Sequence, residues 1–213
     1  MPRPSRHLDR DLLAAGRRLY EEGGCAAISV RRVAEAAGAN PAMVHYHFGS
    51  RDGFVRALLQ TVYDAMFADL SLVADERGQP LTGRLRHSLK VIARFVRDHR
   101  ALLRHLVREA FAGEPAAVDF ARTNLPRHLG VVGRLVAEGQ RDGTLRHVPV
   151  PQALAFVAGA LGAPILAGAA LIASGLAPQE VAASFEADVL SDAALDERID
   201  LVLAGLAAHP PGS

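Results

Sequence analysis

Apolar residues recur at intervals of three and four along almost the whole chain, and glycines and prolines interrupt them at helix-length spacings. The clearest stretch runs from Phe54 to Leu70. Such spacing puts apolar side chains on one face of an α-helix, whereas no segment shows the alternation of β-branched residues that is typical of strands. The pattern therefore predicts an all-α protein.

Three helices, with start and stop signals between them, are predicted for the first 50 residues. Ser29 can cap the second helix, and Asn40 can cap the third, where a proline follows at the first helical position. Gly38 separates these two helices, which gives them the layout of a helix-turn-helix, whose second helix enters the major groove of DNA. The expected helices span residues 8–22, 30–37 and 41–48.

Further helices are predicted for the rest of the chain, with turns at residues 78–80, 113–115 and 142–143. Between the last two of these turns, the sequence Asn124-Leu125-Pro126 predicts a break, because proline removes a backbone donor from a helix. The last helix is expected at residues 195–206.

Residues 148–179 contain no charged side chain, and by length alone they could span a membrane. However, alanine and glycine outnumber the large aliphatic residues and phenylalanine within residues 152–176, and no aromatic belt or Lys/Arg cluster marks an interface with lipid. Small residues let helix backbones approach closely. We therefore favour a helix buried in an oligomer interface, with no membrane contact.

Charge and cysteine content narrow the classes of function. Residues 1–60 carry nine basic and six acidic side chains, whereas residues 148–213 carry one and seven. A basic N-terminal end fits contact with a polyanion. Cys25, as a single cysteine, cannot form an internal disulfide, and the N-terminus lacks the apolar core of a signal peptide. Both features favour a cytoplasmic protein.

The sequence contains no nucleophile elbow, P-loop, dinucleotide fingerprint or H-E-x-x-H motif. We therefore expect no enzyme and no cofactor, and the nine histidines are too scattered to predict a metal site. The unusual feature is the third predicted helix, where His45, Tyr46 and His47 follow one another. Three polar-tipped rings in a row suit a surface that forms hydrogen bonds, while Val44 and Phe48 remain for the core.

The run from Leu12 to Leu59 resembles the DNA-binding domain of the tetracycline-repressor (TetR) family of bacterial transcription regulators. Its most specific elements are HYHF at residues 45–48 and SRD at residues 50–52. A second match, at residues 138–146, is similar to the family's connection between its seventh and eighth helices.

The resemblance implies two kinds of DNA contact. Some residues would touch the phosphate backbone and hold the protein in place, and others would reach base edges and carry the sequence preference. The implied backbone contacts are Ser29, Tyr46, His47 and Arg51, and the implied base contacts are Asn40, Pro41, Ala42 and His45.

Two positions depart from the family pattern. Cys25 replaces an aromatic core residue, so we expect it to pack in the core, with a redox-sensing thiol as the alternative. Gly53 replaces a carboxylate that often completes a capping box, so the start of the fourth helix is expected to be looser.

The C-terminal residues resemble the family in layout only. This layout implies a homodimer formed by the last helices and a small-molecule pocket enclosed by helices four to eight. The polar candidates for this pocket are Tyr63, His105, Glu109, Asn124 and His128. Since His105 and Glu109 lie four residues apart, they can form a pair, and we favour a solvated surface pair over a ligand contact.

Together these features predict a helix-turn-helix DNA-binding domain at residues 1–52 and a helical ligand-binding and dimerisation domain at residues 53–213. The predicted function is a ligand-responsive dimeric transcription regulator, interpreted as a repressor, that binds a palindromic operator in double-stranded DNA and is released by an effector. The alternative is a small-molecule- or protein-binding dimer that has lost sequence-specific DNA binding. The salt dependence of DNA binding distinguishes these two functions. A protein with about 6 to 10 phosphate contacts loses roughly 10³- to 10⁵-fold in affinity for DNA between about 50 and 200 mM salt.

Overall fold

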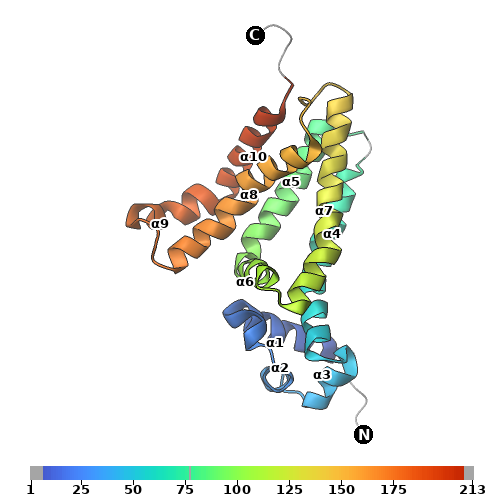
Figure 1. The fold of residues 1–213 in the computed structure, drawn as a ribbon, viewed down its shortest axis with the longest axis vertical. Helices are drawn as coiled ribbons and strands as arrows, with labels where there is room; N and C mark the ends of the chain where they lie inside the picture. Colours follow the sequence, from blue (N-terminus) through green and yellow to red (C-terminus); the bar gives the residue numbers. More distant parts are fainter. Residues whose placement is uncertain (1–6, 77, 209–213) are drawn as a thin grey trace. The chain divides into compact units, whose positions relative to one another are not determined.

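The computed structural model describes residues 7–76 and 78–208, and these residues are almost entirely helical (Figure 1). The predicted all-α fold is confirmed. Residues 1–6, where an export signal would begin, lie outside the described residues. Two compact units are present: one runs to Ala65 and includes Ala101–Asn124, and the other consists of Met66–Arg100 and the residues from Leu125 onward. A compact unit is not the same as a functional domain, so the boundary between residues 52 and 53 stays a prediction.

The first unit begins with the three predicted helices, each within one residue of its expected bounds. Both predicted caps are present: Ser29 Oγ accepts from the Arg32 amide at 3.2 Å, and Asn40 Oδ1 accepts from the Ala42 amide at 2.9 Å. Gly38 has a φ of 63°, a left-handed conformation that lets the chain turn between the two short helices. The elements are α1 (Leu8–Gly23), the 3-10 turn η1 (Gly24–Ala27), α2 (Val30–Ala36) and α3 (Pro41–Phe48).

Helix α4 (Arg51–Ala74) begins shortly after α3 ends in the sequence, and Gly53 makes this close junction possible. A Cβ atom at residue 53 would overlap the carbonyl oxygen of Phe48. Ser50 Oγ accepts from the Gly53 amide at 3.0 Å, and the Phe48 and Phe54 rings meet edge to face with centroids 5.0 Å apart. The departure from the family pattern at residue 53 therefore has a steric reason, and Ser50 still caps the helix.

The break predicted near Asn124-Leu125-Pro126 is wrong. After α6 (Arg100–Phe111), α7 continues from Pro115 to Arg141 with Pro126 inside it. Proline removes one backbone hydrogen bond and crowds the carbonyl four residues earlier, but its φ is compatible with a helix. Buried α7 residues on both sides of it, Phe120 and Asn124 before and Val131 and Val132 after, keep the helix intact. The sequence Asn124-Leu125-Pro126 nevertheless marks a boundary, because the chain passes from the first compact unit to the second between Asn124 and Leu125.

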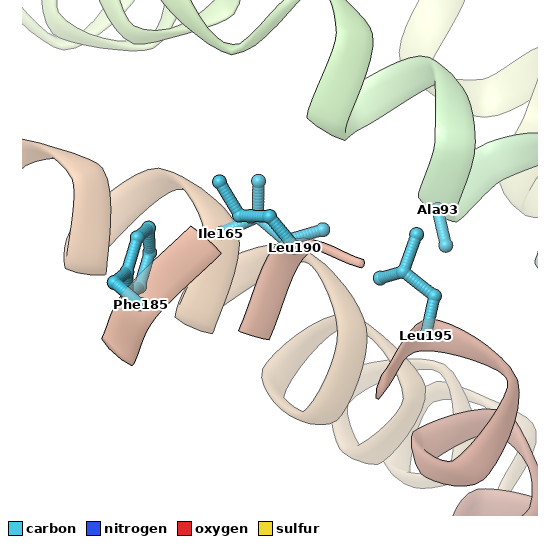
Figure 2. Packing of buried hydrophobic residues seen from close by; sticks show 5 residues of the cluster. All are labelled: Ala93, Ile165, Phe185, Leu190 and Leu195. Atoms are coloured by element: carbon cyan, nitrogen blue, oxygen red, sulfur yellow. The ribbon is translucent and has the colours of Figure 1, made fainter. Parts of the chain in front are cut away.

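The second unit contains α5 (Leu81–Asp98), α8 (Val150–Ala173) and α10 (Asp192–Leu206), which pack against one another. The last helix was predicted from its apolar spacing. Between α8 and α10 the chain forms α9 (Gln179–Phe185) and a π-helical turn, η2 (Glu186–Leu190). Side chains from α5, α8, α9, η2 and α10 meet in one apolar cluster (Figure 2), which consists of Ala93, Ile165, Phe185, Leu190 and Leu195.

Ion pairs join α5 to α10 along their length. The α5 cations are three or four residues apart, and the α10 carboxylates are four apart, which is the spacing of one helix face. The acidic C-terminal segment therefore has cationic partners within its own unit. The pairs are Arg86 with Asp200, Lys90 with Asp196, and Arg94 and Arg97 with Asp192.

Helices α4 and α8 are both long and apolar enough to cross a membrane by length and composition. In α8, only 17% of the most apolar 18-residue window is buried within the chain. Its exposed face carries mainly small residues together with Phe156 and Leu171, which are 46% and 47% exposed. The uncharged stretch noted in the sequence is thus an exposed helix surface in the isolated chain.

Candidate nucleic-acid interface

Most of the predicted DNA-contacting side chains lie on the exposed surface of the first unit. Tyr46 on α3 is 74% exposed, while Val44 on the opposite side of the same helix is fully buried. This division matches the predicted split of α3 between a polar face and the core. The other exposed candidates are Ser29, Asn40, Pro41, Ala42 and His45.

Local hydrogen bonds determine which polar atoms of these residues remain available. His45 Nδ1 lies 3.2 Å from the Gly49 carbonyl, which can only accept, so Nδ1 donates this hydrogen bond and Nε2 takes no part in it. Ser29 Oγ accepts in its cap, which leaves its own O–H free to donate. Asn40 uses Oδ1 for its cap, which leaves its amide NH₂ group as a donor.

His47 differs from the other α3 candidates because it is half-buried. Its Nε2 atom is buried and has no hydrogen-bond partner among the described residues. The ring meets Tyr46 edge to face with centroids 5.1 Å apart. In this position the ring of His47 supports the exposed ring of Tyr46.

Arg51 is held by groups of its own chain. Its Nε donates to the Ile28 carbonyl at 3.2 Å, and Nη2 donates to the Cys25 carbonyl at 2.6 Å. Nη1 pairs with Asp52 at 2.8 Å and with Glu114 at 3.0 Å. Burial opposes the charge, but these carboxylates outweigh it and raise the pKa of Arg51. Four of its five N–H groups thus have internal acceptors.

Arg31 and Arg32 are two exposed cations that the sequence analysis did not include. They stand in the first turn of α2, after Ser29 and Val30, and neither forms an ion pair with any of the described residues. Positive charge at a helix N-terminus is unfavourable, since the helix dipole is positive there. An external anion would relieve that repulsion. Two arginines after a capping serine are the sequence signal that could have identified them.

His105 and Glu109 are buried, at 6% and 8% exposure, so the favoured solvated surface pair is wrong. Tyr20 donates its hydroxyl to Glu109 Oε2 at 2.6 Å, and the Cys25 amide donates to Oε1 at 2.7 Å. The sequence shows that His105 and Glu109 are four residues apart, but it does not show that Tyr20 of α1 and Cys25 of η1 contact Glu109. Burial, with the nearby charges of Arg108 and Arg104, lowers the pKa of His105.

Cys25 is 3% exposed, in agreement with the predicted core role. Burial and the carboxylate of Glu109 raise the pKa of its thiol to about 12. A reactive thiol needs a lowered pKa and access to solvent. Cys25 is buried and its thiol has a raised pKa, which disfavours the redox-sensing alternative.

Two of the remaining pocket candidates contact each other. The Tyr63 hydroxyl donates to the Asn124 carbonyl at 2.9 Å, and the Asn124 side chain exchanges hydrogen bonds with Gln60. Asn124 is 1% exposed, so this polar group lies in the interior of the first unit. His128 is half-buried and belongs to the second unit. The structure therefore distributes the five candidates over separate places.

Comparison with known proteins identifies the family. The sequence model described as "Bacterial regulatory proteins, tetR family" matches residues 12–58, which run from α1 into α4. Two solved structures resemble the chain over nearly its full length. Residues 12–58 therefore form the helix-turn-helix domain of a TetR-family transcriptional regulator.

One of the two structures is a TetR-family regulator from Marinobacter aquaeolei VT8, with a TM-score of 0.67 and 19% identity over 95% of this chain and 96% of that one. The other is a bacterial regulatory protein of the tetR family from Rhodococcus RHA1, with a TM-score of 0.72 and 16% identity over 97% and 100%. These likenesses extend the TetR-family fold to the C-terminal helices.

A curated relative is described as the probable HTH-type transcriptional regulator YttP of Bacillus subtilis (strain 168). It is 23% identical over 134 residues, which are 62% of this chain, and the chain spans 65% of the relative's length. The TetR family consists of transcriptional regulators and not of enzymes, as the sequence analysis expected.

Proposed function

We propose that this TetR-family protein is a homodimeric repressor that binds a palindromic operator and releases it when a small-molecule effector binds. The observation that carries the proposal is the exposed, hydrogen-bonding face of α3 next to the exposed arginines of α2, Arg31 and Arg32. A transcription regulator acts on chromosomal DNA, so its place is the bacterial cytoplasm.

The DNA face is proposed to consist of two layers of contact. The phosphate backbone is held by Ser29, Tyr46, Arg31 and Arg32. His47 supports the ring of Tyr46 by its edge-to-face contact. Asn40, Pro41, Ala42 and His45 face base edges. Asn40 would donate from its NH₂ group, and Pro41 and Ala42 are small enough to approach a thymine methyl group.

Selection of bound sequences from a random duplex library tests this proposal. An inverted repeat is the expected outcome, because two recognition helices in a symmetric dimer read two half-sites. On that operator, Tyr46→Ala should weaken binding to all sequences, whereas Asn40→Ala and His45→Ala should relax the base preference. Phe111→Ala is the matched control, because Phe111 is also an exposed aromatic residue, at 91%, but lies outside α2 and α3. Recovery of no motif by a folded dimer would support the alternative of a dimer that has lost DNA reading.

The dimer interface is proposed on the exposed faces of α8 and α10. Small residues cover the α8 face, and Leu201 on α10 is 66% exposed. Ala163→Glu, in the middle of the exposed α8 face, should convert the dimer to monomers in analytical ultracentrifugation, because a charge would be buried without a partner. Ala68→Glu, on the exposed side of α4, is the control.

The effector site is proposed to include Tyr63 and Asn124, which contact each other within the first unit. His105 and Glu109 are weaker candidates, because Glu109 is occupied by Tyr20 and Cys25. A thermal-shift screen of small molecules, followed by DNA release from the selected operator, would identify the effector. Tyr63→Phe, which removes one hydroxyl and keeps the ring, should then weaken release while leaving operator binding in place.

A further inference from the structure

The peptide groups on either side of Cys25, within η1, are held from two directions. On the N–H side, the Glu109 carboxylate of α6 accepts at 2.7 Å. On the carbonyl side, the Arg51 guanidinium of α4 donates at 2.6 Å, and the same side chain reaches the Ile28 carbonyl at 3.2 Å. One charged group of each sign thus holds the short turn between α1 and α2.

Both charged groups are themselves fixed by further partners. Glu109 accepts the Tyr20 hydroxyl at 2.6 Å, which ties it to α1. Arg51 pairs with Asp52 beside it on α4 and with Glu114 just before α7. A guanidinium with several internal acceptors is restricted in orientation, because its planar donors have fixed directions.

We propose that Arg51 and Glu109 are positioning residues that hold η1, and through it the start of α2, in the arrangement that binds DNA, and that Arg51 is not a phosphate contact. This inference rests on the proposed function, in which α2 and α3 face the DNA. It differs from the role that the family resemblance implies for Arg51.

Electrostatics support this assignment. The charge of Arg51 is more than balanced by the two carboxylates of Asp52 and Glu114, so the local sum is one negative charge. A phosphate approaching this group would meet little attraction. Arg31 and Arg32, in contrast, are exposed and form no ion pair within the described part of the chain.

The connection from the held turn to the DNA face is short. Ile28, whose carbonyl accepts from Arg51, precedes Ser29, and Ser29 caps α2. Loss of the guanidinium would release the carbonyls of Cys25 and Ile28. A displaced cap moves the Ser29 hydroxyl and the two arginines that follow it.

Salt dependence distinguishes positioning from phosphate contact. Operator affinity is measured by fluorescence anisotropy at several salt concentrations for the full-length wild type, Arg51→Gln and Arg51→Lys. Loss of charged hydrogen bonds should reduce the affinity of Arg51→Gln roughly tenfold without changing the salt slope. Arg51→Lys should not rescue the affinity, because an ammonium cannot reproduce the planar fork. A slope smaller by about two for the dimer, or rescue by lysine, would overturn the proposal.

Arg56→Gln is the matched control. Arg56 is an exposed arginine on the same helix, paired with Asp119 of α7 at 3.4 Å, and it does not contact η1. Its loss should leave the affinity within about twofold, as expected for an exposed ion pair.

Glu109→Gln provides a second route if an Arg51 variant fails to fold. It retains the shape of the side chain and one carbonyl oxygen. The losses in affinity of Glu109→Gln and Arg51→Gln should be less than additive in the double variant, because both act on the same turn. Additive losses would contradict a shared role. If the wild-type protein showed no salt-dependent binding to the operator DNA, that result would instead disprove the proposed function.

Discussion

The two compact units place their polar contacts differently. In the first unit, polar side chains join distant elements in the interior, as with Tyr20 and Glu109 or Tyr63 and Asn124. In the second unit, the interior cluster around Ile165 is apolar, and the ion pairs between α5 and α10 lie near the surface. The first arrangement demands specific geometry, whereas the second tolerates change.

This difference follows from the cost of burying polar groups. A buried donor or acceptor without a partner loses the hydration that it had in water, so each interior contact of the first unit has to be made correctly. An exposed ion pair that breaks is rehydrated at little cost. Loss of an interior contact in the first unit, which carries the proposed DNA face, should therefore cost more free energy than loss of a surface ion pair in the second.

The largest effect is expected for Glu109→Ala. This change leaves the Tyr20 hydroxyl and the Cys25 amide without their acceptor in the interior, which should lower the free energy of unfolding by about 4 kcal/mol in urea denaturation. Glu22→Ala, the control, removes an exposed carboxylate from α1. It should change the free energy of unfolding by less than about 0.5 kcal/mol. Equal effects of the two variants would show that the interior contact contributes nothing.

Ile165→Ala tests the apolar interior of the second unit. Ile165 is fully buried among Phe185, Leu190 and Leu195, so a cavity should form and lower the free energy of unfolding by about 3 kcal/mol. The same denaturation experiment measures it. Leu72→Ala, at a side chain that is 73% exposed, is the control and should be close to neutral.

His105 predicts a pH dependence in the first unit. Burial and the charges of Arg108 and Arg104 lower its pKa, and Glu109 opposes them. Since the pKa is lower in the folded than in the unfolded state, the unfolded state binds more protons as the pH falls through 6.5 and below. Stability should therefore decrease on acidification. His105→Gln should flatten this dependence between about pH 7 and pH 5, and an unchanged profile would assign it to other groups.

The smallest effect is expected on the surface of the second unit. Lys90 and Asp196 lie 2.6 Å apart but are partly exposed. A double-mutant cycle of Lys90→Gln and Asp196→Asn should give a coupling energy below about 1 kcal/mol that decreases with added salt. A salt-insensitive coupling of several kcal/mol would remove the distinction between the two units.

Local signals predicted much of the fold. The caps at Ser29 and Asn40 and the turn at Gly38 lie where the sequence placed them, because each depends on residues no more than four positions away. The exposed ring of Tyr46 could also be predicted, since a polar face and a core face alternate along one short helix. The break predicted at Pro126 is absent, because a proline signal is local while the packing that keeps α7 intact is not.

The sequence was enough to predict the helical fold class, the helix-turn-helix and the resemblance of its N-terminal region to the TetR family, since all three depend on short, contiguous patterns. The partners of Arg51 and Glu109 became visible only in the tertiary structure. Their partners lie far along the chain, with 63 positions between Arg51 and Glu114 and 89 between Tyr20 and Glu109. A charged residue has the same local pattern whether it faces water, a phosphate or a buried peptide group, and only folding brings that environment to it.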